Sequence, residues 1–198
     1  MGLAGADPAA AEGPPERPDT RQVMFVGNNW EGTADIVDAH KSRRLARINT
    51  IPDREERMAE IQSDPERLAF FLAIRQAVGE GNDQFTDDMF TSHDGRFVYV
   101  SRPSFADVVG ISLRTGEIVW RFPMEGQRSD HMAISPDGTT LLVSDSTANK
   151  VHRLDAETGR RPASSPPATR PTRTTTRRTA GSCTTRASGV CTRPPTRS

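Results

Sequence analysis

Cysteine, aromatic residues and long apolar runs are all scarce in this chain of 198 residues. Both cysteines, Cys183 and Cys191, lie in the last part of the chain, so the rest has neither a disulfide framework nor a cysteine metal site. Aromatic residues make up 6% and hydrophobic residues 34% of the chain, which is low for a globular protein. No apolar run approaches the roughly 20 residues of a transmembrane helix.

Targeting and catalytic motifs are missing as well. No complete signal peptide is visible, so the compartment stays open, export of a longer form included. No nucleophile motif, phosphate-binding loop or Cys/His metal-ligand spacing occurs. The sequence therefore assigns no catalytic residue, no cofactor and no metal centre, and it leaves open whether the protein is an enzyme.

What the chain does contain is a repeat of 43 residues. The stretch MFTSHDGRFVYV begins at Met89, and MAISPDGTTLLV begins at Met132, so their Asp-Gly turns align without a gap. The later turns Thr115-Gly116 and Thr158-Gly159 align at the same spacing. A weaker copy, VMFVGNNWEGTADIVDAHKS (23–42), precedes them at an offset of 74 residues. Repeats of this length indicate an array of similar structural units.

Each copy contains short β-rich runs between turn residues, for example 97–100 and 108–113, then 117–122 and 131–135. Four strands at a period of about 40–45 residues are typical of a propeller blade. We therefore predict an all-β fold, a partial β-propeller of about three four-stranded blades with a helical insertion and disordered termini. An unrelated pair of hairpins is the alternative.

The copy SPDGTTLLVSDSTANKVHRLDAETG (135–159) resembles the YVTN-type β-propeller repeat. That repeat has an SPDG turn, a YVTN-like strand and a strand that ends in Thr-Gly. The resemblance covers residues 22–50 and 87–161, with His93 in place of the proline and Lys41-Ser42 in place of Thr-Gly. It implies a propeller that binds a ligand or protein through its channel face. Similar propellers include quinoprotein dehydrogenases and lactonases, so a fragment of such an enzyme is the alternative.

The predicted organisation has five parts: a disordered segment (1–21), a partial first blade (22–52), a helical insertion (53–84), two blades (85–161) and a disordered basic tail (162–198). In the insertion, Ser63 or Asp64 can cap a helix that starts at Pro65. Leu68, Phe71, Leu72 and Val78 recur at helical spacing. The helix either decorates the propeller rim or covers the channel as a lid.

The tail is rich in Arg, Thr, Pro and Ser and has no acidic residue. Read one frame over, PTRTTTRRTAGSCTTRASG (171–189) can encode HENNYTPDGGKLYHASIG, with its PDG turn close to the place that the 43-residue period requires. We therefore predict that the tail is out-of-frame sequence and that the protein is truncated and without function. A genuine basic tail that binds nucleic acid is the alternative.

In a propeller, the loops before each innermost strand and those between the second and third strands share one face, around the channel. The residues predicted to bind there are Asn28, Asn29, Trp30, Asp87, Asp88, Arg102, Asp130, His131 and Asp145. Such groups suit acid–base chemistry or a divalent metal, although His131 can instead hydrogen-bond a neighbouring turn.

Four further expectations concern side-chain placement. One of the adjacent Asp87 and Asp88 should face the channel. Trp30 and Phe105 should wall a pocket. His40 and His152 should lie on the surface, and Trp120 should pack on an outer strand.

Overall fold

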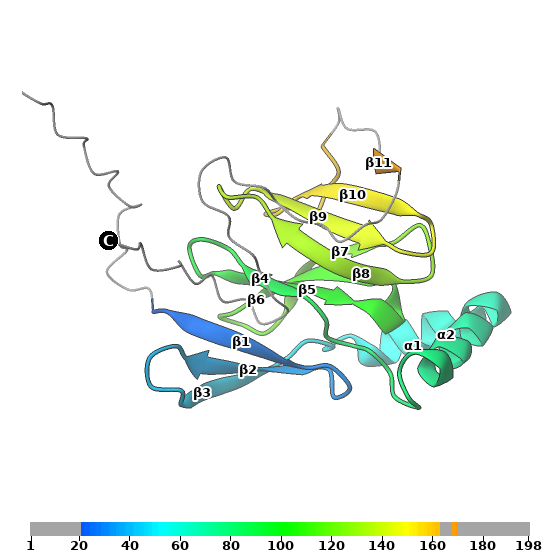
Figure 1. The fold of residues 1–198 in the computed structure, drawn as a ribbon, viewed down its shortest axis with the longest axis horizontal. Coiled ribbons are helices and arrows are strands. Elements are labelled where there is room, and N and C mark those ends of the chain that lie inside the picture. The colour runs from blue at the N-terminus through cyan, green and yellow to red at the C-terminus, as the bar shows by residue number, and fades with distance from the viewer. Residues whose placement is uncertain (1–20, 163–167, 170–198) are drawn as a thin grey trace, which may run out of the picture.

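The computed structural model describes residues 21–162 and 168–169 (Figure 1). Three antiparallel sheets follow one another along the chain, and two helices separate the first sheet from the second. Most of the predicted disordered segment 1–21 and of the tail 162–198, which is predicted to be disordered and out of frame, lies outside the described residues.

The first sheet has three strands in the order β1-β2-β3. Its strands are β1 (Val23–Asn28), β2 (Thr33–Asp38) and β3 (Arg44–Asn49). The sheet corresponds to the second, third and fourth strands of a blade, because Val26 aligns with Val100 of the later copy. Among the described residues, β1 pairs with β2 alone.

The second and third sheets each have four strands arranged as a meander. The second contains β4 (Met89–Thr91), β5 (Phe97–Arg102), β6 (Asp107–Ser112) and β7 (Ile118–Pro123), with a short 3-10 helix η1 (Pro103–Phe105) between β5 and β6. The third contains β8 (Ser129–Ile134), β9 (Thr140–Asp145), β10 (Lys150–Asp155) and β11 (Ala168–Thr169). The predicted fold class, an all-β partial β-propeller of about three four-stranded blades with a helical insertion, is confirmed, although the first sheet has three described strands.

One tight turn recurs in all three sheets and shows how the sequence copies correspond. The backbone N–H groups of Ser42, Gly116 and Gly159 each donate to the carbonyl four residues earlier, at 3.0, 2.8 and 2.9 Å. All three residues have positive φ, at 50°, 76° and 67°. Glycine suits this conformation because it lacks a Cβ. Ser42 adopts it in the copy whose sequence departs from Thr-Gly.

The middle sheet is buried on both faces and forms the centre of the described fold. Val98 and Val100 of β5 belong to a cluster that Phe25 of the first sheet packs against. Tyr99, on the opposite face of β5, belongs to a second cluster with Leu141 and Val143 of the third sheet. Burying each such aliphatic side chain contributes about 1.5–3 kcal/mol. Side chains that alternate along β5 therefore pack towards the first sheet on one face and towards the third sheet on the other.

The insertion forms two helices, α1 (Arg54–Ser63) and α2 (Pro65–Ala77). The Asp64 carboxylate accepts hydrogen bonds from the N–H groups of Glu66 and Arg67, so Asp64 is the N-cap of α2. Phe71 is buried as the helical spacing predicts, whereas Leu72 and Val78 are 47% and 49% exposed. Neither helix is long and apolar enough to cross a membrane.

The helices pack on one end of the middle sheet, where η1 lies (Figure 1). Ile61 of α1 and Phe71 of α2 form a buried cluster with Phe85 and Phe105. Phe85 and Phe105 come from the two loops of the second copy that are predicted to form the channel face. The insertion therefore covers part of the predicted channel face; the contacts do not place it on the outer rim.

Consecutive repeats share core contacts through Trp120 of β7. Its ring stacks on Tyr99, with centroids 5.7 Å apart. On its other side lies Gly159 of the next copy, where an added Cβ would come within 2.4 Å of the Trp120 Cε3 atom. The equivalent Gly116 has no atom within 4 Å of that position.

We therefore expect Gly159→Ala to destabilise the protein more than Gly116→Ala. Both changes place a side chain at positive φ, at a cost of about 1–2 kcal/mol. Gly159→Ala adds overpacking against Trp120, typically about 1–3 kcal/mol. The free energies of unfolding in urea measure the difference. Equal losses in the two variants would contradict the packing of Trp120 against Gly159.

Candidate functional site

Four polar side chains meet where the second and third sheets begin. Asp87 and Asp88 precede β4, and the residues 43 positions later are Asp130 and His131 of β8. The two pairs therefore occupy equivalent places in neighbouring copies. We call Asp87, Asp88, Asp130 and His131 the acidic cluster.

The acidic cluster is held together by backbone and side-chain contacts. The Asp88 carboxylate accepts a hydrogen bond of 2.8 Å from the N–H of Met132, which links the start of β4 to β8. His131 Nδ1 lies 3.5 Å from Asp88 Oδ2, and its Nε2 lies 3.9 Å from Asp130 Oδ1. One donor atom each of Asp87, Asp130 and His131 lies within 4.8 Å of the others.

Both Asp87 and Asp88 approach His131, although we expected a single one of them at the channel. Strict alternation applies to a regular strand, whereas these residues precede β4. Their backbone still pairs with β5, because the Asp87 N–H donates to the Ser101 carbonyl and the Ser101 N–H donates to the Asp88 carbonyl, both at 3.0 Å. The backbone that carries the two carboxylates is thus fixed by main-chain hydrogen bonds.

The electrostatic environment of the acidic cluster favours the neutral, protonated form of the Asp87 carboxyl. Burial, together with the charges of Asp88 and Asp130, raises the pKa of Asp87 to about 6. Arg128 and His131 oppose this shift through their positive charge. The Arg128 guanidinium, however, donates to the Gln84 side chain at 2.5 Å. Among the described residues, the ion pairs of Asp88 and Asp130 involve His131 and no Lys or Arg.

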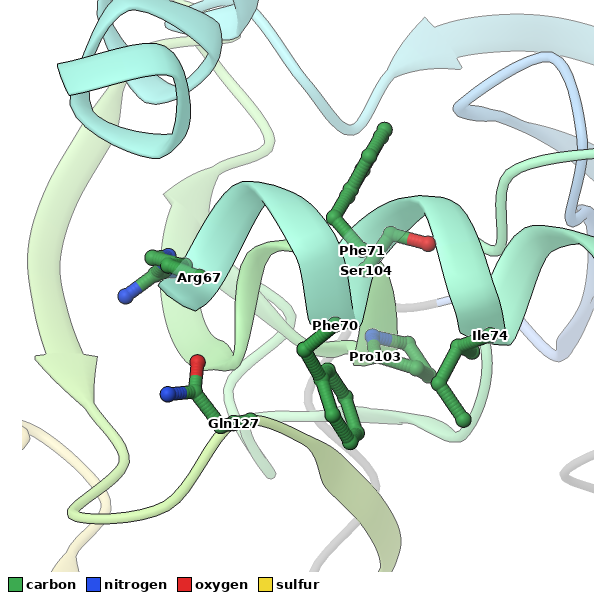
Figure 2. A pocket seen from close by; sticks show the side chains of 7 residues that line it. All are labelled: Arg67, Phe70, Phe71, Ile74, Pro103, Ser104 and Gln127. Atoms are coloured by element: carbon green, nitrogen blue, oxygen red, sulfur yellow. The ribbon is translucent and has the colours of Figure 1, made fainter. Parts of the chain in front are cut away.

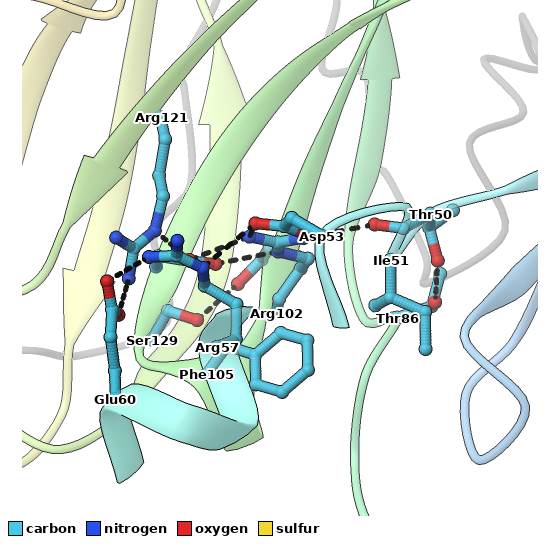
Figure 3. A network of polar contacts seen from close by, with 12 residues as sticks. Thr50, Ile51, Asp53, Arg57, Glu60, Thr86, Arg102, Phe105, Arg121 and Ser129 are labelled. Atoms are coloured by element: carbon cyan, nitrogen blue, oxygen red, sulfur yellow. Dashed lines mark hydrogen bonds and ion pairs between the residues drawn. The ribbon is translucent and has the colours of Figure 1, made fainter. Parts of the chain in front are cut away.

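Arg102, by contrast, is buried in a network under the helices (Figure 3). Its guanidinium donates to Asp107 through Nε and Nη2, at 2.7 Å each, and to Asp53 through Nη1, at 2.5 Å. It also donates to the Thr50 carbonyl at 3.3 Å. This network ties β5 and β6 to the start of α1. The predicted role of Arg102 on an open channel face therefore conflicts with its burial.

Asp145 is also fully buried and organises two loops. Its carboxylate accepts hydrogen bonds from the N–H groups of Gly126 and Ala148, at 2.9 and 3.2 Å. His152 Nε2 lies 3.2 Å from the same carboxylate. The expectation that His152 lies on the surface is wrong, because its side chain is enclosed beside Asp145 and its ring packs against Phe122.

The first-sheet candidates take three different positions. The Asn28 amide donates to the Thr33 hydroxyl at 3.1 Å, within its own hairpin. The Asn29 side-chain oxygen accepts from the Thr86 N–H at 3.2 Å, next to Asp87. The Trp30 side chain is 57% exposed. Asn29 therefore connects the first sheet to the loop that carries Asp87.

Phe105 does not line an open pocket with Trp30, since it is completely buried beneath the helices. A small, open depression lies nearby (Figure 2). Its lining residues are Arg67, Phe70, Phe71, Ile74, Pro103, Ser104 and Gln127. Sequence reasoning missed this depression. Phe70 and Phe71 of α2 are adjacent aromatic residues in a chain with few aromatics, and this is the sequence feature that could have indicated the depression.

Comparisons with known proteins report fold-level likeness. No protein-family model and no curated protein matches the chain. Among solved structures, hydrazine synthase of Kuenenia stuttgartiensis superposes with a TM-score of 0.46 and 17% identity, over 68% of this chain and 30% of the other. Dihydro-heme d1 dehydrogenase NirN in complex with DHE gives 0.45 and 18%, over 73% of this chain and 25% of the other. The chain thus spans less than a third of either protein.

The raised pKa of Asp87 predicts a specific dependence of stability on pH. Asp87 releases its proton near 3.8 when unfolded and near 6 when folded, so its contribution to stability falls as the pH rises through that window. Asp87→Asn should therefore be more stable than the wild type at about pH 7.5, and this advantage should shrink towards about pH 4. Urea unfolding at both pH values measures it. The exposed substitution Glu117→Gln should show no such change, and a constant Asp87→Asn difference would contradict the prediction.

Proposed function

We propose that this chain is a fragment of a YVTN-type β-propeller whose channel face binds a positively charged ligand or a basic segment of a protein. The observation that carries the proposal is the convergence of Asp87, Asp88, Asp130 and His131 from equivalent positions of two adjacent sheets. Their repeat relationship supports a shared site, because equivalent loops of successive blades surround one channel.

The charge balance supports a cationic ligand. Asp53 and Asp107 are paired with arginine in the Arg102 network, and exposed Asp35 is paired with Arg47. The carboxylates of the acidic cluster have His131 as their ion-pair partner among the described residues. A ligand that brings positive charge would relieve the repulsion between them.

Asn29 and Trp30 extend the proposed binding face towards the first sheet. The Asn29 side chain accepts a hydrogen bond from the N–H of Thr86, the residue before Asp87. The neighbouring Trp30 has an exposed side chain. Aromatic faces attract ammonium and guanidinium groups. Carboxylates together with an exposed Trp thus favour an amine or guanidine over a neutral ligand.

The enzymatic alternative is supported by one property of the same cluster. A carboxyl with a pKa of about 6 beside a histidine can act as a general base near neutral pH. Nothing in the described residues identifies a substrate pocket at that point. The binding role is therefore the proposal that the geometry favours.

Binding of a cationic probe tests the proposal. We expect the peptide tetralysine to bind the wild type at low salt, as followed by isothermal titration calorimetry. The double variant Asp87→Asn/Asp130→Asn should weaken binding at least about tenfold, since two of the carboxylates are lost. Glu55→Gln/Glu117→Gln removes the same charge from exposed positions elsewhere and should leave the affinity within about twofold. Equal weakening by both variants would reduce the effect to net charge and overturn the proposal.

The fragment proposal extends to the tail, of which residue 162 and the short strand β11 (Ala168–Thr169) are described. We propose that residues 162–198 are out-of-frame and that the chain lacks the loops that complete its site. It then keeps the acidic cluster but does not perform the function of the full propeller. Closed propellers have at least about four blades, and three sheets are described here. Sequencing the coding region from Asp155 through a further blade tests this. Further PDG turns near the 43-residue period are expected in the shifted frame, and early stop codons there would contradict the proposal.

A further inference from the structure

We propose that Asp87, Asp130 and His131 bind a divalent first-row transition-metal ion. This inference rests on the proposed function, since it assigns a ligand to the same face. It also goes beyond the motifs of the sequence, which contain no conventional metal-ligand spacing.

The distances between the donor atoms suit a single ion. The three donors lie within 4.8 Å of one another. Two donors that each lie about 2.1 Å from a metal are at most about 4.2 Å apart. Small rotations of partly exposed side chains bridge this difference, and His131, with 56% of its side chain exposed, is free to make them.

The position of Asp88 within the cluster supports the same assignment, because it lies where the outer partner of a ligating histidine belongs. Nε2 of His131 faces Asp130, and Nδ1 on the other side of the ring faces Asp88 at 3.5 Å. Asp88 is itself anchored by the Met132 N–H. Histidines that bind metals through one nitrogen commonly donate the other N–H to a carboxylate, which fixes the ring orientation and the tautomer.

The donor types indicate the class of ion. Two carboxylates and one imidazole suit Zn²⁺, Co²⁺ or Mn²⁺, whereas Ca²⁺ and Mg²⁺ prefer oxygen ligands throughout. Three protein donors also leave coordination positions for water or for an atom of a bound ligand. The ion would balance the carboxylates that arginine does not pair.

The contrast with the Arg102 network shows that converging carboxylates alone do not define such a site. Asp107 is fully buried, yet it is contacted at 2.7 Å by Arg102 and at 2.5 Å by Arg121. Glu60 likewise contacts Arg57 and Arg121. Those carboxylates already have cationic partners. The acidic cluster combines carboxylates for which no ion pair with Lys or Arg is found among the described residues with an imidazole whose second nitrogen faces an anchored carboxylate.

A Co²⁺ titration followed by visible absorption tests the inference. The full chain is used with Cys183→Ser and Cys191→Ser, because thiolates bind the same ions. We expect one Co²⁺ per chain at about pH 7.5, with weaker binding in acidic solution, because ligands must lose their protons to bind a metal ion. His131→Gln and Asp130→Asn should each weaken binding at least about tenfold, and Asp88→Asn about 10–100-fold.

The exposed His40 provides the matched control. His40→Gln removes an imidazole from a surface turn and should leave Co²⁺ binding unchanged, while circular dichroism checks that every variant is folded. Co²⁺ binding that is equal in His131→Gln and His40→Gln would overturn the metal site. No Co²⁺ binding with intact tetralysine binding would overturn this inference alone. Absence of both would overturn the proposed function as well.

Discussion

The buried guanidinium of Arg102 connects segments that lie far apart in the sequence. It holds Asp107 of its own sheet, Asp53 before α1 and the carbonyl of Thr50 after the first sheet. Removing one partner of a buried ion pair typically costs about 3–5 kcal/mol, because the remaining charge stays buried. Together with the apolar cluster of Ile61, Phe71, Phe85 and Phe105, this network positions the helices on the loop end of the middle sheet.

The strands were predictable because the repeat encodes them locally. Asp94-Gly95 and Asp137-Gly138 mark the same turn in two copies, and alternation along β5 follows directly from its residues. The side-chain networks were not predictable in this way. Arg102 and Asp145 occupy equivalent positions, yet one pairs with Asp53 from the insertion and the other with His152. Those partners lie outside the local pattern, so no spacing rule predicts them.

The acidic cluster was partly predictable for the same reason. Asp87, Asp130 and His131 stand before or at the start of equivalent strands, and the propeller expectation alone places such loops together. That expectation does not specify that the Met132 N–H anchors Asp88, or that the His131 ring lies between Asp88 and Asp130. The repeat also does not predict the depression beside α2, because the helical insertion has no counterpart in the other copies from which its packing could be inferred.

The contact between Trp120 and Gly159 has a consequence for how such a chain can change length. The glycine belongs to one copy and completes the core of the copy before it, so the structural unit is offset from the unit read in the sequence. The equivalent Gly116 of the middle copy meets no such partner, because the last strand of the first sheet carries no Trp. Loss or duplication of 43 residues would therefore keep this contact only where the strand brought beside the glycine carries an aromatic residue at the position of Trp120.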